Sequence, residues 1–355
     1  MKKLIIKSKI HDYEVCFQSE LHPLTALKYD KNAIFIVDSN VYAKYADNFE
    51  GIQFERIYKL DAIEENKNLE TIKILYSYLL KFSTKRDIHI VSIGGGIVQD
   101  LTGFLASTIY RGVQWTFFPT TLLAQADSCI GGKTSLNVDG FKNIIGTFYP
   151  PTKIQICTKF LESLEEIELQ SGIGEIIKFH LLKRPLPESI DTIESMVQDI
   201  RMGKYLDAIH STHLIKISYI KDDEFDTGIR NLFNYGHCFG HAIEATSNYE
   251  VPHGIAITMG MVLANNLSLR RKWLSRHLCE TINYELLLPN LIGKIKQSYF
   301  EPSKIIECLK NDKKRVGNFL TIILMRNDQL NAIKADDITE AEVIQTLSDV
   351  KWERC

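Results

Sequence analysis

A glycine-rich turn that joins a strand pattern to a helix pattern constrains the fold of this chain more than any other feature. An apolar run at residues 88–93 leads directly into Gly94-Gly95-Gly96, helical spacing follows at residues 98–108, and a second β-rich run follows at residues 114–118. A strand, a crossover helix and a further strand in this order predict a parallel sheet with helices on its faces.

The turn itself is a candidate phosphate-binding loop. Glycines at this point let backbone N–H groups approach a pyrophosphate, and the helix N-terminus adds a favourable dipole. The segment is not the usual dinucleotide fingerprint, because Gln99 occupies the place of the third glycine. A tight turn with a purely structural role explains it equally well.

The rest of the chain divides into two parts with different patterns. A buried-strand pattern at residues 33–37 ends on Asp38, and helical spacing covers residues 69–82. Strand patterns become rare after about residue 160; helical patterns there cover residues 160–182, 187–205, 232–245 and 253–270, and one β-rich run covers residues 319–324. We therefore expect an α/β nucleotide-binding domain with a parallel sheet over residues 1–160 and a mostly helical domain over residues 161–355.

The composition excludes several classes of protein. The 355 residues are 45% hydrophobic and 24% charged, which is typical of a globular protein with a substantial core. The net charge of -2 argues against a nucleic-acid-binding protein. The seven cysteines are scattered without a CxxC pair, as in a reducing compartment. Since no apolar run of about 18 residues could span a bilayer, we expect a cytoplasmic protein with neither membrane nor nucleic acid as a partner.

A second glycine-containing segment carries several groups that bind anions. Residues 127–134 read DSCIGGKT, and Lys142-Asn143 follow shortly after. Two glycines, two lysines and an amide in a short loop suit phosphate or another oxyanion. The first glycine of a Walker A loop is missing, and an ordinary surface loop has the same composition.

Carboxylate and imidazole side chains in the second half suggest a metal. Glu175 and Lys178 stand three residues apart and share a helix face, although a surface ion pair is the commoner outcome. His237 and His241 stand four apart, and His253 follows within 17 positions. Two imidazoles on one helix, with a carboxylate from elsewhere, form a zinc site that is open for catalysis. Spacing alone selects His237 and His241 as the ligand pair; histidines satisfied in the core are the alternative.

Taken in order, these motifs resemble the dehydroquinate synthase family of sugar phosphate cyclases. The family pattern contains GGG(I/V)xxDLxGFxAxxxxRG, PTTLLAQxDSxxGGKTxxN, GKNxIGxFYxP, SGxxEIIK, GxRxxLNxGHxxGHAIE and HG. This chain has GGGIVQDLTGFLASTIYRG, PTTLLAQADSCIGGKTSLN, FKNIIGTFYPP, SGIGEIIK, GIRNLFNYGHCFGHAIE and HG. The matches are dense between residues 90 and 260, and weaker ones extend to residues 64–67 and 312–314, so the resemblance covers nearly the whole chain.

The resemblance implies residues for each part of the site. It implies one divalent metal, zinc or cobalt, held by Glu175, His237 and His253, and this set replaces the pair selected by spacing. It implies NAD along the first domain, at Asp38, Glu64, Lys67, Gly95, Gly96, Asp100, Thr120, Thr121, Lys142 and Ser163. The matching positions that face the substrate are Asp127, Lys133, Asn143, Lys178, Lys216, Arg230, Asn234, His241 and Lys313. Arg111 matches a position that reaches the neighbouring subunit's site, so a homodimer is implied.

The activity implied is that of a lyase that releases phosphate from a small sugar phosphate. It closes 3-deoxy-D-arabino-heptulosonate 7-phosphate into 3-dehydroquinate, and NAD is used catalytically because the hydride it accepts is returned. Lys133, Asn143 and Lys313 would hold the phosphate, whereas Lys216 and Arg230 would hold the carboxylate. The alternative for Arg230 is an ion pair with one of the nearby acids, at residues 222, 223 and 224.

Three positions depart from the family pattern. Gln99 replaces a commonly small residue, Gly174 replaces a frequent alanine, and Ile255 stands where a glutamate usually follows HG. These departures leave open a sister cyclase that makes another cyclitol. Cyclases of neutral sugar phosphates tend to replace the arginine or the asparagine upstream of GH, and since Arg230 and Asn234 both remain, an acidic substrate is favoured. A metal-dependent polyol dehydrogenase shares the two-domain plan, but the phosphate-directed lysines disfavour it.

Overall fold

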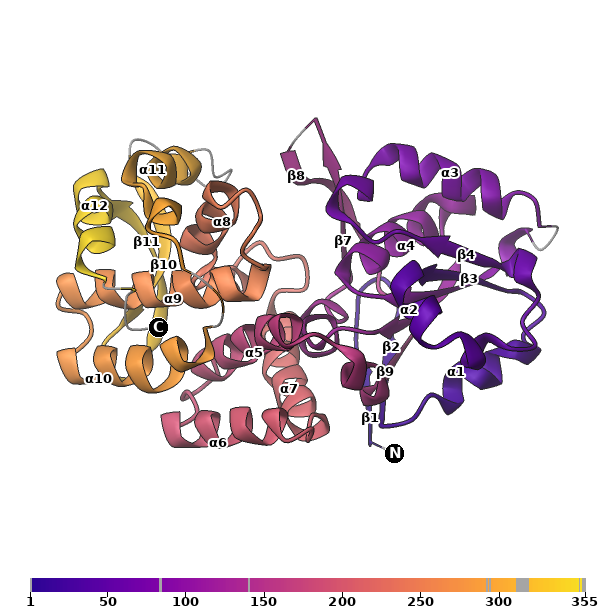
Figure 1. Ribbon diagram of the computed structural model, residues 1–355, viewed down its shortest axis with the longest axis horizontal. Coiled ribbons are helices and arrows are strands. Elements are labelled where there is room, and N and C mark those ends of the chain that lie inside the picture. The colour runs from indigo at the N-terminus through magenta and orange to yellow at the C-terminus, as the bar shows by residue number, and fades with distance from the viewer. Residues whose placement is uncertain are drawn as a thin grey trace. The chain divides into compact units, whose positions relative to one another are not determined.

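The computed structural model describes residues 2–82, 85–139, 141–291, 293, 295–310, 319–350 and 352 (Figure 1). The chain divides into two compact units. The first unit contains residues 1–164 and 205–213, and the second contains residues 165–204 and 214–355. Among the described residues, no helix combines the length and the apolar character needed to cross a membrane.

The first unit is built on a seven-stranded sheet with the order β1-β2-β9-β6-β5-β3-β4 (Figure 1). Its strands are β1 (Lys2–Ile6), β2 (Tyr13–Gln18), β3 (Ala33–Asp38), β4 (Ile57–Leu60), β5 (His89–Gly94), β6 (Gln114–Pro119) and β9 (Lys153–Cys157). Within this sheet, β1 runs antiparallel to β2 and the other pairings are parallel. The predicted parallel sheet is confirmed, and its strands include the three expected at residues 33–37, 88–93 and 114–118.

Both faces of this sheet are covered, which explains why its central strands are almost continuously apolar. Phe35 and Val37 point to one face and pack with Leu24 of α1 (His22–Ala26) and with α2 (Ser39–Lys44). Successive side chains of a strand alternate between faces, so Ile34 and Ile36 point to the other; both are fully buried. α4 (Gly96–Thr108) packs against β5 and β6, and α3 (Leu69–Leu79) packs against α4.

The segment expected to be an anion-binding loop has more regular structure than its glycines suggested. A turn of π-helix covers Ala124–Ser128, and Lys133 begins the hairpin of β7 (Lys133–Val138) and β8 (Phe141–Phe148). Gly131 and Gly132, both with positive φ, form the connection between them. The loop is therefore confined to about four residues, because the alternating pattern after Gly132 pairs as a strand.

The second unit is mostly helical, as expected. Its helices are α5 (Glu166–Leu181), α6 (Ile190–Arg201), α7 (Leu206–Asp222, whose first residues belong to the first unit), α8 (His237–Thr246), α9 (His253–Arg270), α10 (Arg276–Glu280), α11 (Pro302–Lys310) and α12 (Glu340–Asp349). The antiparallel strands β10 (Leu320–Arg326) and β11 (Asn331–Ile338) complete it (Figure 1).

Glycines bring three of these helices into backbone contact. A Cβ on Gly254 of α9 would lie 1.8 Å from the Ser171 carbonyl oxygen of α5, and one on Gly260 would lie 2.0 Å from the Gly236 carbonyl oxygen just before α8. Larger residues at either position would push the helices apart. This close packing sets the distances between side chains at residues 175, 237 and 253, which lie on α5, α8 and α9 respectively.

Candidate active site

Residues expected to bind the cofactor lie at one edge of the large sheet. Asp38 ends β3, Gly95 and Gly96 follow β5, and Thr120 and Thr121 follow β6. The strand ends are level, because Val37 pairs with Ile93 and Gly94 pairs with Pro119. Chain order reverses between β3 and β5, since β4 lies on one side of β3 and β5, β6 and β9 lie on the other. Open α/β sheets bind ligands at such a reversal, beyond the carboxyl ends of the strands.

The N-terminus of α4 is shaped to accept an anion at this edge. Gly95 caps the helix without a side-chain hydrogen bond, and a Cβ on Gly96 would meet nothing within 4 Å. A 13-residue helix also presents a positive dipole end to a ligand placed there. These features fit the pyrophosphate of a dinucleotide.

Gln99, which stands in place of the third glycine, connects this helix to the π-helical turn. Its Nε2 donates to the Ser128 carbonyl oxygen at 2.7 Å, and Ser128 Oγ donates to Gln99 Oε1 at 2.6 Å. The departure from the family pattern therefore has a structural consequence. It holds the residue next to Asp127 against the helix that begins at Gly96.

Expected cofactor and substrate residues of the first unit are joined in one hydrogen-bonded network. Lys67 Nζ lies 2.6 Å from Asp100 Oδ2 and donates to Asn143 Oδ1 at 2.7 Å. Ser135 Oγ lies 2.9 Å from the same Asp100 oxygen and 2.8 Å from Asn143 Oδ1. Ser135 was not selected from the sequence, although it lies inside the quoted GGKTSLN motif. Its role depends on the β7–β8 pairing, which spacing alone does not reveal.

The same network continues to Glu64. Asn137 Nδ2 donates to Glu64 Oε1 at 2.8 Å, and Lys142 Nζ lies 3.6 Å from that oxygen. Asn137 Oδ1 also accepts a hydrogen bond from the backbone N–H of Asn143 at 3.0 Å, where the chain has a φ of 55°. Asn137 thus holds Asn143 where the β7–β8 pairing is irregular, and it too was missed by sequence reasoning.

The remaining expected residues of the first unit are placed separately. Ser163 ends the 3-10 turn after β9, and its Oγ accepts a hydrogen bond from Tyr45 at 3.0 Å. Asp127 lies in the π-helical turn, and Lys133 is exposed at the start of β7. Arg111 is exposed in the turn after α4, with a φ of 64°. Its reach into a neighbouring subunit stays a prediction.

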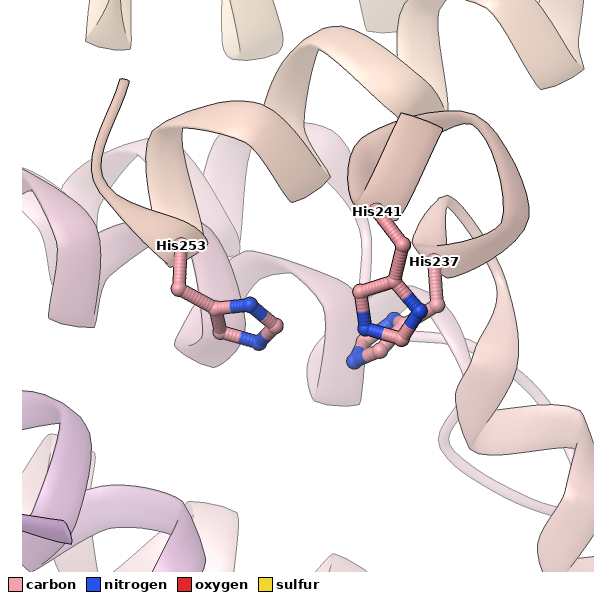
Figure 2. Close-up of side chains that lie close together, drawn as sticks. All are labelled: His237, His241 and His253. Carbon is pink, nitrogen blue, oxygen red and sulfur yellow. The ribbon is translucent and has the colours of Figure 1, made fainter. Parts of the chain in front are cut away.

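Three imidazoles converge in the second unit (Figure 2). His237 and His241 come from α8 and His253 begins α9, and one nitrogen of each lies within 4.8 Å of the others. Their ring centroids are 5.4 to 5.7 Å apart. Both the pair selected by spacing and the pair implied by the family resemblance therefore belong to one cluster. His241 is the exposed member, and the other two are partly buried.

Glu175 adds a carboxylate to two of these imidazoles. Its Oε1 lies 3.5 Å from His237 Nε2 and 3.6 Å from His253 Nε2, and the side chain is fully buried. Tetrahedral ligands about 2.0–2.2 Å from a zinc ion lie roughly 3.3–3.6 Å from one another. Neither carboxylate oxygen has a hydrogen bond of good geometry among the described residues. The donor set fits a single ion of the zinc or cobalt type.

Outer hydrogen bonds orient both imidazoles toward that point. His237 Nδ1 lies 3.3 Å from the Tyr235 carbonyl oxygen, and His253 Nδ1 lies 3.3 Å from Glu244 Oε2. A proton held at Nδ1 leaves the lone pair of Nε2 for a metal. Burial, followed by the Lys178 charge, also lowers the pKa of His237 well below its usual value, which favours the neutral ligand form. Sequence reasoning missed Glu244 because its partner begins another helix.

The Glu175 carboxylate is also paired with Lys178 one helical turn away. Burial alone would raise the pKa of Glu175, but its neighbours, above all the charge of Lys178, lower that pKa. The carboxylate therefore stays ionised, as a metal ligand must be.

Gly174 lets this part of α5 approach α9, since a Cβ there would lie 2.4 Å from Thr258 Oγ1. That contact explains why this chain has glycine where alanine is frequent.

Three cations are buried in the second unit. Lys178 is 2% exposed, Arg230 is 3% exposed and Lys216 is 5% exposed. The ammonium groups of both lysines lie near the Phe179 ring, at 4.6 and 5.8 Å from its centroid. Buried cations are costly unless they meet negative charge, and Lys178 meets it in Glu175. Asn234 is half-buried, and its Nδ2 donates to the Asn231 carbonyl oxygen at 2.8 Å.

Lys313, expected to bind phosphate, lies outside the described residues. Ile255, which stands where a glutamate is usual, is 2% exposed and belongs to the buried part of α9.

Glu244, the hydrogen-bond partner of His253, gives a first test of the metal site. Glu244→Ala should lower zinc affinity roughly 10- to 100-fold, because His253 loses the acceptor that fixes its tautomer and orientation. Competition with a chromophoric chelator measures the change. Glu250→Ala is the matched control, since its carboxylate is exposed and pairs with Lys296. Equal affinities for both variants and the unaltered protein would show that Glu244 does not support the site.

Comparisons with known proteins agree with this geometry. A family model described as 3-dehydroquinate synthase N-terminal matches residues 57–171, and one described as 3-dehydroquinate synthase C-terminal matches residues 172–315. The 3-dehydroquinate synthase of Clostridium tetani is 34% identical over 332 residues, which cover 91% of this chain and 87% of the relative. That of Dehalococcoides mccartyi strain CBDB1 is 36% identical over 292 residues, which cover 81% and 80%.

Solved structures share the fold at lower identity. The 2-epi-5-epi-valiolone synthase of Streptomyces hygroscopicus, solved with NAD+ and Zn2+, has a TM-score of 0.83 at 23% identity, covering 95% of this chain and 96% of that one. A 2-deoxy-scyllo-inosose synthase in complex with carbaglucose-6-phosphate, NAD+ and Co2+ has a TM-score of 0.77 at 23% identity, covering 98% and 99%. An iron-containing alcohol dehydrogenase of Thermotoga maritima has a TM-score of 0.60 at 15% identity, covering 94% and 96%.

Proposed function

Because the chain belongs to the 3-dehydroquinate synthase family, we propose that it converts 3-deoxy-D-arabino-heptulosonate 7-phosphate into 3-dehydroquinate and inorganic phosphate. One observation carries the proposal: a buried carboxylate oxygen lies 3.5 and 3.6 Å from two imidazole nitrogens, on a helix whose Lys178 is also buried. Relatives that bear this name and match 80% or more of the chain support it.

The two units hold the two bound groups in this proposal. Glu175, His237 and His253 hold the metal in the second unit. The sheet edge and the network of the first unit hold NAD, through the ten cofactor positions named above. When bound, NAD would accept a hydride from the carbon that bears the reacting hydroxyl and later return it, and the metal would polarise that hydroxyl.

The chain's own residues bind and orient the substrate. Lys178 donates hydrogen bonds to the reacting hydroxyl, since its buried ammonium lies beside the metal ligand Glu175. Lys133, Asn143 and Lys313 bind the phosphate, and Lys216 and Arg230 bind the carboxylate. Holding both ends of a flexible seven-carbon chain lowers the entropic cost of closing the ring.

The remaining substrate positions surround the reacting carbons. Asp127, Asn234 and His241 face the substrate hydroxyls, and the exposed imidazole of His241 can hold or release a proton there. Arg111 reaches the site of a second copy, so the enzyme is a homodimer. A cytoplasmic enzyme is part of the same proposal, supported by scattered cysteines that form no disulfide among the described residues.

A phosphate-release assay tests the function. The purified enzyme with NAD and zinc is given 3-deoxy-D-arabino-heptulosonate 7-phosphate, sedoheptulose 7-phosphate or glucose 6-phosphate, and NADH absorbance is followed in parallel. We expect phosphate release from the first substrate without net NADH.

Two other results would overturn the proposal. Turnover of sedoheptulose 7-phosphate with no activity on the keto acid phosphate would make the protein a sister cyclase. Stoichiometric NADH from a polyol would make it a dehydrogenase, a class with which it shares the fold.

A further inference from the structure

The segment that follows α7 is folded around one carboxylate. Asp223 Oδ1 accepts a hydrogen bond from the Thr227 N–H at 2.9 Å, and its Oδ2 accepts from the Gly228 N–H at 2.8 Å and the Arg230 N–H at 2.9 Å. We infer that Asp223 is a positioning residue that aims Arg230 at the substrate carboxylate and thereby contributes to the choice of an acidic substrate. The inference rests on the proposed function.

These hydrogen bonds hold a loop whose N–H groups point inward. Backbone N–H groups that no strand or helix satisfies need another acceptor, and an ionised one gives the stronger hydrogen bonds. The chain reverses at Asp226, where φ is 57°, and so brings the three N–H groups to the two oxygens of a single side chain. Burial alone would raise the pKa of Asp223, but the N–H groups of Thr227, Arg230 and Gly228 lower it, so the carboxylate is ionised at neutral pH.

Both ends of Arg230 are held by two consecutive residues of this loop. Asp223 binds its backbone N–H, and the carbonyl oxygen of Glu224 accepts a hydrogen bond from its Nη1 at 2.6 Å. The side chain is 3% exposed, so it is held inside the folded unit. A guanidinium binds a carboxylate through two parallel hydrogen bonds only when the two planes are aligned. A shift of the loop would therefore weaken recognition while the positive charge remained.

The effect of position can be separated from that of charge. Asp222 is the neighbouring residue with the same charge, but it is exposed and pairs with Arg184 at 3.2 Å. Asp222→Asn removes one negative charge next to the loop and leaves the three N–H contacts of Asp223 in place. It is the matched control for Asp223→Asn, which keeps the side-chain shape but has one acceptor oxygen.

The experiment measures product inhibition in the holoenzyme with zinc and NAD. 3-Dehydroquinate carries the carboxylate and inorganic phosphate does not. Asp223→Ala should raise the inhibition constant of 3-dehydroquinate about 10- to 100-fold, as expected for misplacing charge-assisted hydrogen bonds. Asp223→Asn should raise it less, and both variants should leave the inhibition constant of phosphate unchanged. Asp222→Asn should alter neither constant.

Other results would contradict either the positioning role of Asp223 or the proposed function. Equal weakening of both inhibitors, or loss of zinc or NAD, would reduce Asp223 to a structural residue. Unchanged inhibition by 3-dehydroquinate in Asp223→Asn would also overturn the inference, even if Asp223→Ala does not fold. The proposed function fails separately if the unaltered enzyme does not convert 3-deoxy-D-arabino-heptulosonate 7-phosphate.

Discussion

His253→Ala should remove the bound metal and abolish turnover, whereas His241→Ala should leave the metal content nearly intact. His253 Nε2 lies 3.6 Å from Glu175 Oε1 and its Nδ1 is held by Glu244, so its loss deprives the site of an oriented ligand. Metal activation of a hydroxyl is worth several kcal/mol, and we expect turnover to fall by about 10³-fold or more. His241 is the exposed imidazole of the cluster, and we assign it to the substrate.

Elemental analysis of the two variants after dialysis against equal zinc decides between the two ligand sets. The substitutions are matched, because each removes one imidazole of the same cluster. Metal lost from His241→Ala and retained by His253→Ala would contradict the set Glu175, His237 and His253. The pair on one helix, His237 and His241, would then be the correct one.

This ambiguity shows what the sequence could and could not predict about the site. Two histidines four apart must share a face of one helix, so His237 and His241 could be paired from spacing alone. Glu175 and His253 lie on other helices. Their approach depends on backbone contact between α5 and α9 at Gly254, which no local pattern encodes. The family resemblance selected them without explaining their distance.

The fold was predictable where a long segment is almost entirely apolar or small. Residues 253–270 were expected to form a helix and form α9 with the same bounds, because nearly every position in that stretch is apolar or small. The hairpin of β7 and β8 was not expected, since its glycines read as a loop. α7 was not expected either: its polar residues, such as His210 and His213, interrupt the apolar pattern. Both elements are stabilised by packing within the folded unit and not by local preference.

The sequence also did not predict side-chain roles that depend on hydrogen bonds to the backbone. Asp223 looked like one of three acids that might pair with Arg230. In the structure its carboxylate binds backbone N–H groups, Asp222 pairs with Arg184, and Glu224 offers its carbonyl oxygen. An ion pair with one of these acids was the alternative considered for Arg230, and the folded loop uses Asp223 and Glu224 to hold the backbone and the side chain of the arginine.

Arg230→Lys should impair turnover of 3-deoxy-D-arabino-heptulosonate 7-phosphate strongly while zinc and NAD stay bound. A lysine keeps the charge, but its ammonium cannot donate to the Glu224 carbonyl oxygen and also match the two oxygens of a carboxylate in one plane. Losing a charge-assisted contact in a buried site costs roughly 2–4 kcal/mol, which lowers kcat/KM about 30- to 1000-fold. Steady-state kinetics measures this change.

The matched control is Arg184→Lys, another arginine-to-lysine exchange beside the same loop. Arg184 is partly exposed and pairs with Asp222, so its replacement should leave kcat/KM within about twofold, as for most surface substitutions. If Arg230→Lys behaved like this control, Arg230 would be only a structural cation, a role that lysine can fill. A loss confined to Arg230→Lys, with zinc and NAD retained, would instead mean that the buried guanidinium recognises the acid group of the substrate. That acid group is absent from sedoheptulose 7-phosphate and glucose 6-phosphate.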